Sequence, residues 1–243
     1  MHRQEHKLAK LRLTPERPIS AQIYDFLRSE ITTTAIQPGA LISENELSAH
    51  FNVSRQPIRE ALMRLRLDGL LTVMPQRGSI VEKISVSNLK QICFLRSAIE
   101  CAAVENATEI SDTQLDAIVA QLEQNVARQR EVVTEGDNVT RGFLNLDDEF
   151  HRLVTSLSTC PMAWDNIQSL KPQMDRIRYL SQGEVSPYAL LIDDHARICA
   201  ALKARDFAAA RQHLHHHLHE IMETYVAIRE QYAQWFCEEE DGI

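Results

Sequence analysis

The sequence predicts a mainly α-helical protein with a small N-terminal module that carries a β-hairpin and a larger C-terminal bundle of antiparallel helices. Seven glycines and eight prolines in 243 residues leave little room for the turns of a large β-sheet protein. Apolar residues recur at helical spacing along most of the chain. A composition of 44% hydrophobic and 25% charged residues is that of an ordinary globular protein.

The two parts of the chain differ in the sign of their charge. Residues 1–83 hold 12 lysines and arginines against 9 acidic residues, a net charge of +3, whereas residues 84–243 hold 14 against 25, a net charge of −11. We therefore expect only the N-terminal part to meet phosphate groups.

The sequence also argues against several classes of protein. The first residues, MHRQEHKLAKLRL, contain no apolar signal-peptide core, and nowhere do eighteen apolar residues run together. The five cysteines are odd in number, far apart and without a CxxC pair, which argues against a disulfide framework or a thiolate zinc site. We expect a cytoplasmic protein without a membrane partner.

The N-terminal module is predicted to span residues 18–84, after an arm of residues 1–17. An amphipathic helix is expected over 18–34, and Ser43 with Glu46 has the spacing of a capping box that begins a short second helix. Ser54 is a natural N-cap for the third helix, SRQPIREALMRLRLDGLL. Two short helices around a tight turn are typical of a helix-turn-helix.

The last of these helices carries cations where a DNA-reading helix needs them. Arg55 and Arg59 lie one turn apart near its start, where arginine can reach O6 and N7 of guanine in the major groove. The following LTVMPQRGSIVEKI reads as strand, turn and strand, with Gly78 able to take a positive φ and Arg77 at the tip of a wing. The alternative is that these arginines form only the solvated side of an amphipathic helix.

The C-terminal body, residues 85–243, reads as helical throughout. Breaks at 111–112, 135–137, 158–161, 183–187 and 205–206 separate the expected helices. Those helices are predicted near 86–107, 112–134, 138–158, 161–181, 186–204 and 206–236.

Three of these helices carry potential metal ligands on partly apolar faces. Asp147 and His151 are four residues apart and share a face of their helix, and His195 lies in an apolar stripe of another. The stretch RQHLHHHLHE, residues 211–220, adds five histidines, of which His217 lies about 60° from the centre of the buried face and His213 about 100° from it. His217 is therefore the best inward candidate, and His213 is held in reserve.

Two interpretations of these histidines stay open at this point. Each of them could be a hydrogen-bonded core residue. Together with the carboxylate, three imidazoles also suit one divalent ion such as Zn²⁺, Ni²⁺, Mn²⁺ or Co²⁺, since facing bundle helices commonly build such sites.

The N-terminal module resembles the winged helix of the GntR family of bacterial transcription regulators. SENELSAHFNVSRQPIREALMRLRLDGLLTVMPQRGSIV follows that family's pattern over about forty residues, and Gln56 stands where threonine is commoner. The resemblance implies DNA contacts from Arg55, Gln56 and Arg59, and a wing tip formed by Arg77 and Gly78.

The body resembles the FadR-type effector domain of the same family, called the FCD domain, in its metal-binding branch. DDEFH, DDH and HHHL match that branch's ligand motifs, which implies Asp147, His151, His195 and His217 as ligands. The early RSAIE motif implies that Arg96 binds an effector carboxylate; an ordinary helix-surface arginine is the alternative.

Together these features predict a homodimeric transcription regulator, not an enzyme, that represses a neighbouring catabolic operon. Its expected partners are an inverted-repeat DNA operator and a small carboxylic or sugar acid, with one divalent metal ion per chain. The alternative is a metal-dependent hydrolase with an appended DNA-binding-like domain. Against it, the chain has no HExxH motif, and Glu149 projects about 200° away from His151 around their helix.

Overall fold

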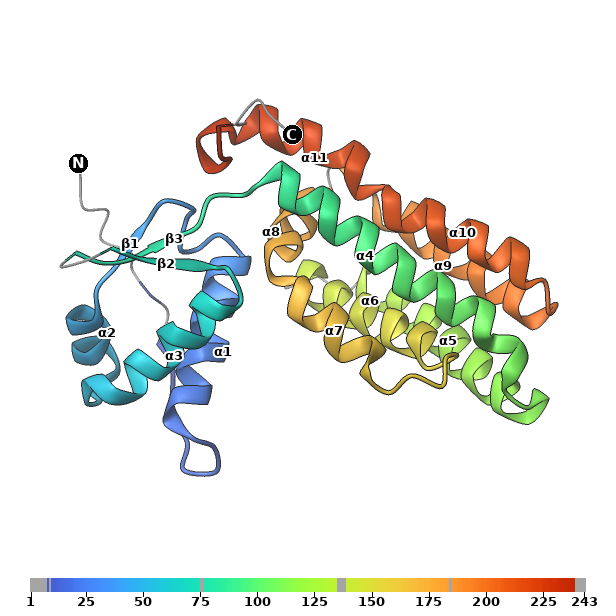
Figure 1. Cartoon of the computed structure of the whole chain (residues 1–243), viewed down its shortest axis with the longest axis horizontal. Coiled ribbons are helices and arrows are strands. Elements are labelled where there is room, and N and C mark those ends of the chain that lie inside the picture. The colour runs from blue at the N-terminus through green and yellow to red at the C-terminus, as the bar shows by residue number, and fades with distance from the viewer. Residues whose placement is uncertain (1–7, 9, 75–76, 135–138, 184, 239–243) are drawn as a thin grey trace. The chain divides into compact units, whose positions relative to one another are not determined.

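The computed structural model describes residues 8, 10–74, 77–134, 139–183 and 185–238. They form two compact units, each described by itself below (Figure 1). The first unit holds the described residues up to Val86, Pro172–Arg176 and the described residues from Tyr232 on, and the second holds Ser87–Lys171 and Ile177–Gln231. Most of the expected arm, the middle of the wing turn and the expected helix break at 135–137 lie outside the described residues.

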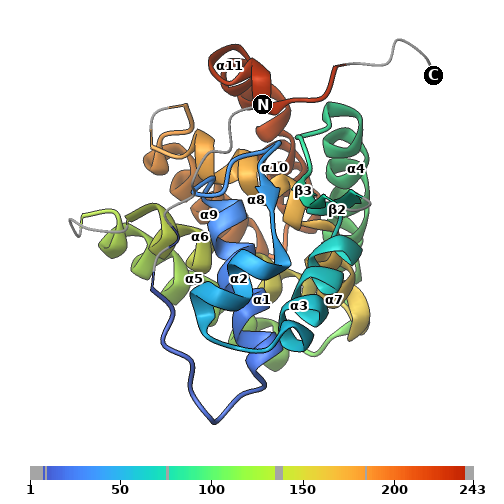
Figure 2. The same ribbon diagram turned by 90° about the vertical axis from the view of Figure 1, so that its left-hand side faces the viewer.

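The first unit contains three helices and a small sheet (Figure 2). The helices are α1 (Ile19–Thr32), α2 (Glu44–Phe51) and α3 (Arg55–Leu67). Asn52 takes a left-handed conformation, with φ of 53°, in the tight turn between α2 and α3. The apolar sides of the helices share one core, whose fully buried members are Ile23, Leu27, Ile31, Ile58, Ala61, Leu65 and Leu70.

The two expected N-caps behave differently. The Ser43 hydroxyl accepts a hydrogen bond from the Glu46 backbone N–H at 3.5 Å, as a cap should. Ser54 occupies the N-cap position of α3, but its side chain makes no capping bond within the described structure. Pro57 explains part of this difference, because it is the third residue of α3 and has no N–H to offer to the Ser54 side chain.

The wing is part of a three-stranded antiparallel sheet. Strands β2 (Leu71–Met74) and β3 (Gly78–Val81) form the predicted hairpin, and β1 (Leu41–Ile42) adds a short edge strand beside β3. Gly78 has φ of 110°, and a Cβ there would lie 2.5 Å from the Ile42 carbonyl oxygen. Only glycine therefore lets β3 approach β1 this closely.

The second unit is an all-helical bundle. Its helices are α4 (Val86–Glu105), α5 (Asp112–Val132), α6 (Val139–Thr155), α7 (Met162–Leu170), α9 (Tyr188–Lys203), α10 (Phe207–His219) and α11 (Ile221–Gln231), together with the second half of α8 (Pro172–Ser181), whose residues Pro172–Arg176 belong to the first unit. A short 3₁₀ helix follows α4 at Asn106–Glu109, and another, at Ala233–Trp235, belongs to the first unit. Residues from α4, α5, α6, α9 and α10 build one core around Phe143 and Phe150, so the predicted mainly α fold is confirmed. Across the described residues no helix is both long and apolar enough to cross a bilayer.

Two of the predicted helices are each divided in the structure. The helix expected over 161–181 ends at Leu170 and restarts at Pro172, because proline cannot donate the backbone hydrogen bond that would continue α7. The helix expected over 206–236 is divided at Glu220, where the backbone bond tightens to His217 three residues back, and α11 ends at Gln231.

Candidate metal centre and nucleic-acid interface

The arginines predicted to contact DNA surround one groove of the first unit. Its volume is about 620 Å³. The residues that line it are Ser43, Glu44, Asn45, Arg55, Arg59, Leu62, Met63, Arg66, Val73, Met74, Arg77, Gly78 and Ser79. Four of these residues are arginines, and Glu44 is the one carboxylate among the described lining residues. The groove between α3 and the wing is therefore strongly cationic.

Two of the predicted DNA-contacting side chains are held by acidic neighbours. Arg59 Nε donates to Glu44 Oε2 at 2.8 Å, and Gln56 Nε2 donates to Glu60 Oε1 at 3.0 Å. Arg64 behaves differently, since its guanidinium lies over the Tyr24 ring, 4.0 Å from the ring centroid, and not in the groove. The arginines of α3 thus divide between the groove and packing against α1.

The structure brings Asp147, His151, His195 and His217 together in the second unit. One potential ligand atom from each lies within 4.8 Å of the others, and all four residues are buried. His217 Nε2 lies 3.1 Å from His195 Nε2 and 3.3 Å from His151 Nε2. The Asp147 carboxylate oxygens lie 3.7 Å from His151 Nε2 and 3.6 Å from His195 Nε2. Helices α6, α9 and α10 therefore direct three Nε2 atoms and a carboxylate to one point.

A second layer of polar side chains orients two of the imidazoles. Glu100 Oε2 lies 2.6 Å from His151 Nδ1, and Gln129 Oε1 lies 2.8 Å from His195 Nδ1. Gln129 Nε2 in turn donates to Asn125 Oδ1, which fixes the amide so that its oxygen accepts. Both Nδ1 atoms therefore carry the proton, and both Nε2 atoms present a lone pair.

This assignment leaves the centre of the cluster short of protons. Nε2 of His217 can carry at most one hydrogen, yet that atom contacts two other Nε2 atoms. At most one of the two contacts can be a hydrogen bond, so the lone pair on Nε2 of His151, of His195 or of both has no donor among these three atoms. A cation among the three nitrogens and the carboxylate would satisfy these lone pairs, so the residues present fit a divalent metal ion.

The distances agree with this chemistry. With metal–nitrogen bonds of about 2.0–2.1 Å, tetrahedral ligand atoms lie roughly 3.4 Å apart and octahedral neighbours roughly 2.9 Å apart. The separations of 3.1 to 3.7 Å in the cluster lie close to this range.

The electrostatics keep the ligand groups in the protonation states that metal binding requires. Burial lowers the pKa of His151 and of His195, and the charge of Arg96 acts in the same direction on both, so both imidazoles are neutral near pH 7. Burial alone would raise the pKa of Asp147, but the Arg178 guanidinium, which bonds Oδ2, opposes it most strongly, and that pKa is lowered. Asp147 is thus an anion beside the neutral imidazoles of His151 and His195.

Arg96, predicted to bind an effector, lies next to the cluster rather than on the helix surface. It is buried, and its Nε donates to Glu100 Oε1 at 2.5 Å, while the other oxygen of Glu100 contacts His151. Burial opposes the ionisation of Glu100, but Arg96 and His151 together lower its pKa to about 2. Glu100 therefore links Arg96 to His151 of the cluster, one carboxylate oxygen contacting each.

Of the five histidines in the run, the structure places His217 in the cluster. His215 and His216 are exposed, and the rings of His215 and His219 stack with centroids 4.1 Å apart on the outer side of α10. His213 is partly exposed and does not join the cluster.

Sequence reasoning missed several residues that shape both sites. Asn125 and Gln129 could have been noticed, because both interrupt the apolar stripe of α5 at buried positions. Arg178 and Glu44 gave no such signal, since their partners Asp147 and Arg59 are distant in sequence.

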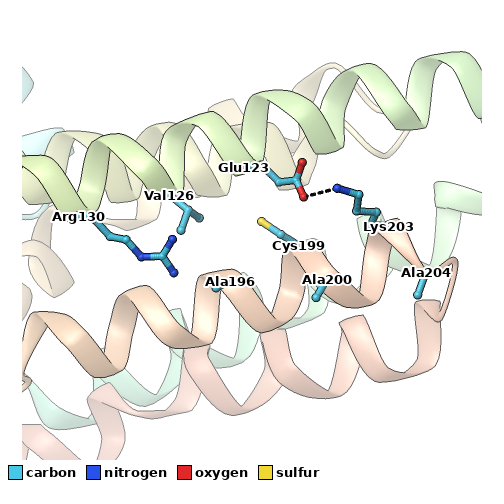
Figure 3. A pocket seen from close by; sticks show the side chains of 8 residues that line it. All are labelled: Glu123, Val126, Arg130, Ala196, Cys199, Ala200, Lys203 and Ala204. Atoms are coloured by element: carbon cyan, nitrogen blue, oxygen red, sulfur yellow. Dashed lines mark hydrogen bonds and ion pairs between the residues drawn. The ribbon is translucent and has the colours of Figure 1, made fainter.

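A further groove of about 520 Å³ runs between α5 and α9 in the second unit (Figure 3). Ala196, Ala200 and Ala204 lie along one side, and Glu123 and Lys203 form an ion pair of 2.8 Å across it. None of the described residues predicted to bind DNA, metal or effector lines this groove.

A winged helix-turn-helix with a cationic groove, joined to a helical bundle with a buried His/Asp cluster, defines a DNA-binding regulator. Residues 19–81 match the model of "Bacterial regulatory proteins, gntR family", and residues 91–220 match that of the FCD domain. The chain belongs to the GntR family of transcription regulators and carries an FCD domain. It is therefore a regulator and not an enzyme. In the hydrolase alternative Glu149 would be the nearby base, but its carboxylate accepts hydrogen bonds from Asn125 and Arg128.

Relatives and solved structures agree with this assignment. The chain is 43% identical over 228 residues to the HTH-type transcriptional repressor RspR of Escherichia coli K12, covering 93% of this chain and 97% of that protein. A regulator from an unstable DNA locus of Streptomyces ambofaciens is 33% identical, with 88% of each chain covered. The structure of E. coli McbR/YncC matches with a TM-score of 0.67 and 25% identity over 89% of this chain and 99% of that one. A GntR-type regulator from Rhodococcus sp. RHA1 shares the fold, with a TM-score of 0.70 and 22% identity over 86% and 98% of the two chains.

The buried pair of Arg96 and Glu100 yields a stability prediction. Glu100→Leu removes the buried carboxylate that bonds both Arg96 and His151, and we expect it to lower the free energy of unfolding by about 3–5 kcal/mol in urea denaturation with EDTA present. The double variant Arg96→Met/Glu100→Leu removes both charges and should lose distinctly less. A double variant as unstable as Glu100→Leu would show that the two charges are not coupled.

Proposed function

We propose that this protein is a homodimeric, metal-containing repressor whose FCD domain binds a small organic or sugar acid and thereby controls operator binding by the winged helix. The observation that carries the proposal is the convergence of three imidazole Nε2 atoms and the Asp147 carboxylate on one buried point. The repressor role is supported by the 43% identical relative named a transcriptional repressor.

The proposed metal ligands are Asp147, His151, His195 and His217. A bound Zn²⁺, Ni²⁺, Mn²⁺ or Co²⁺ ion would supply open coordination positions for a carboxylate oxygen of the effector. The chain's own contribution is to align two of the imidazoles through Glu100 and Gln129, while burial keeps His151 and His195 neutral. Arg96, buried beside Glu100, adds a cation for the effector carboxylate.

The metal proposal is tested by elemental analysis of tag-free protein purified without chelator. We expect about one divalent ion per chain in the wild type and in His216→Ala, whose imidazole is exposed. His151→Ala and His217→Ala should each lose the ion, since each removes one of four ligands. His213→Ala should retain it if His217 alone of the run is a ligand. Wild-type protein without metal, or metal retained in both ligand variants, would refute the site.

DNA recognition is proposed to use Arg55, Gln56 and Arg59 on α3, with Arg77 and Gly78 at the wing. The four groove arginines and the position of α3 beside the wing support this assignment. An effector that favours one arrangement of the bundle would shift the population of dimers able to bind the operator.

Arg59→Ala tests the DNA assignment. We expect binding to an operator selected from random duplexes to weaken by about 1–3 kcal/mol if Arg59 contacts a base. Arg211→Ala, which removes an exposed arginine from the acidic bundle, is the matched control and should change little. Fluorescence anisotropy at several salt concentrations measures both, and unchanged affinity of Arg59→Ala throughout would remove Arg59 from the interface.

The homodimer is proposed to form through an exposed apolar face of α4. Phe94 is 70% and Leu95 43% exposed, and Ala98 and Ala102 are exposed on the same side. These four positions lie within an arc of about 100° on the helix. The small alanines allow close approach of a second helix, and a helix with apolar residues on both its buried and its outer side is typical of an interface.

Phe94→Glu should therefore shift the protein towards monomer, because it places a charge in the centre of the proposed interface. Light scattering coupled to gel filtration would show a roughly halved mass at micromolar concentration. Leu190→Glu on α9, where the native side chain is 62% exposed, is the control and should leave the mass unchanged. A dimeric Phe94→Glu would place the interface elsewhere.

A further inference from the structure

Glu44 is a negative charge inside a groove that otherwise suits DNA. It is the first residue of α2, and of the described residues lining the groove it is the one carboxylate beside four arginines. A carboxylate facing phosphate lowers the affinity for any duplex. General attraction to DNA therefore does not explain why a carboxylate lies in this groove.

The contact between Glu44 and Arg59 offers an explanation. The hydrogen bond of 2.8 Å engages Arg59 Nε, so the guanidinium is held at its base while its two terminal nitrogens remain for another partner. The Arg59 side chain is 57% exposed, so the ion pair with Glu44 leaves it accessible to a ligand. A guanidinium fixed in this way loses less conformational freedom when it forms two parallel bonds to guanine.

We propose that Glu44 is a positioning residue that sets guanine specificity by orienting Arg59 and by weakening sequence-independent phosphate contacts. The inference rests on the proposed base contact of Arg59 and goes beyond it. A free arginine could turn towards the backbone and bind phosphate on any sequence. The Glu44 carboxylate opposes this rotation of the Arg59 side chain in two ways: it holds Nε by a hydrogen bond, and it repels nearby phosphates.

A similar arrangement on α3 is consistent with this role. Gln56 Nε2 donates to Glu60 Oε1, four residues along the helix, so a second candidate DNA-contacting side chain is also held by a carboxylate. Its amide oxygen is then the group turned towards other partners.

A simpler role for Glu44 is to stabilise the start of α2, because acidic side chains interact favourably with a helix N-terminus. Glu46 lies in the same first turn but does not line the groove. Glu46→Ala therefore reproduces the loss of a first-turn charge without touching Arg59, and serves as the matched control.

The test compares full-length wild type, Glu44→Ala, Glu44→Gln, Glu46→Ala and Arg59→Ala. Each is titrated with a duplex selected from a random pool by the wild type, with versions of that duplex in which single guanines are replaced, and with a scrambled duplex. Thermal melts first establish that each variant is folded. The readouts are the affinity ratio at each guanine and the affinity for scrambled DNA as a function of salt.

We expect Glu44→Ala to lower discrimination by about three- to tenfold at the guanine where Arg59→Ala also loses it. Its affinity for scrambled DNA should rise, and the slope of log affinity against log salt should steepen by up to about 1 as Arg59 gains a phosphate. Glu44→Gln keeps an oxygen for Arg59 Nε, so it should retain more discrimination while also binding scrambled DNA more tightly. Glu46→Ala should match the wild type in both.

Two kinds of failure are distinguishable. Guanine preference retained by Arg59→Ala overturns the base contact itself, and with it this inference. Preference lost by Arg59→Ala but kept by Glu44→Ala overturns the positioning role alone. Equal losses in Glu44→Ala and Glu46→Ala would reduce Glu44 to a helix-terminal charge, and a loss at a different base pair would mean that Glu44 contacts DNA directly.

Discussion

The convergence of three imidazole Nε2 atoms on one buried point is the constraint on which the organisation of the bundle depends. Two of the imidazoles hydrogen-bond through Nδ1 to side chains of other helices, Glu100 on α4 and Gln129 on α5. Nδ1 of His217 lies 3.7 Å from an oxygen of Asp194 on α9, beyond hydrogen-bond distance. Buried polar groups are costly unless they are satisfied, so the cluster ties five helices together. A change at its centre acts on all of them.

Charge balance around the cluster follows from the same constraint. Asp147 is a buried anion beside the neutral imidazoles of His151 and His195, and Arg178 on α8 compensates its charge through Oδ2. Arg178 also bonds Asp148, whose carboxylate accepts two hydrogen bonds from buried Lys171. Removing one partner from such a buried network costs more than an exposed pair would, because the remaining charge keeps its desolvation penalty. The acidic residues of α6 are therefore fixed from outside the cluster as well as from within it.

The groove of the winged helix combines four arginines with one carboxylate among its described lining residues. Four arginines around one groove would bind any duplex, and salt-dependent affinity of that kind carries no sequence information. In the role proposed for Glu44, its hydrogen bond to Arg59 would lower this general affinity and fix the guanidinium. The two units thus use carboxylates in the same way, to hold a cation or an imidazole in the orientation that its ligand requires.

The sequence was sufficient to predict the four residues of the His/Asp cluster because the inward position of each depends on the geometry of a single helix. His217 could be selected from five histidines by its angle from the apolar face of α10, and Asp147 with His151 by four-residue spacing. The division of the predicted helices at Pro172 and Glu220 did not disturb this reasoning, since neither break lies between residues of one ligand motif. Glu100, Gln129 and Arg178 depend instead on how separate helices pack, and only the fold brings them to the cluster. A single sequence therefore predicts which side chains point into the bundle. The side chains that orient them by hydrogen bonds can be identified only from the tertiary structure.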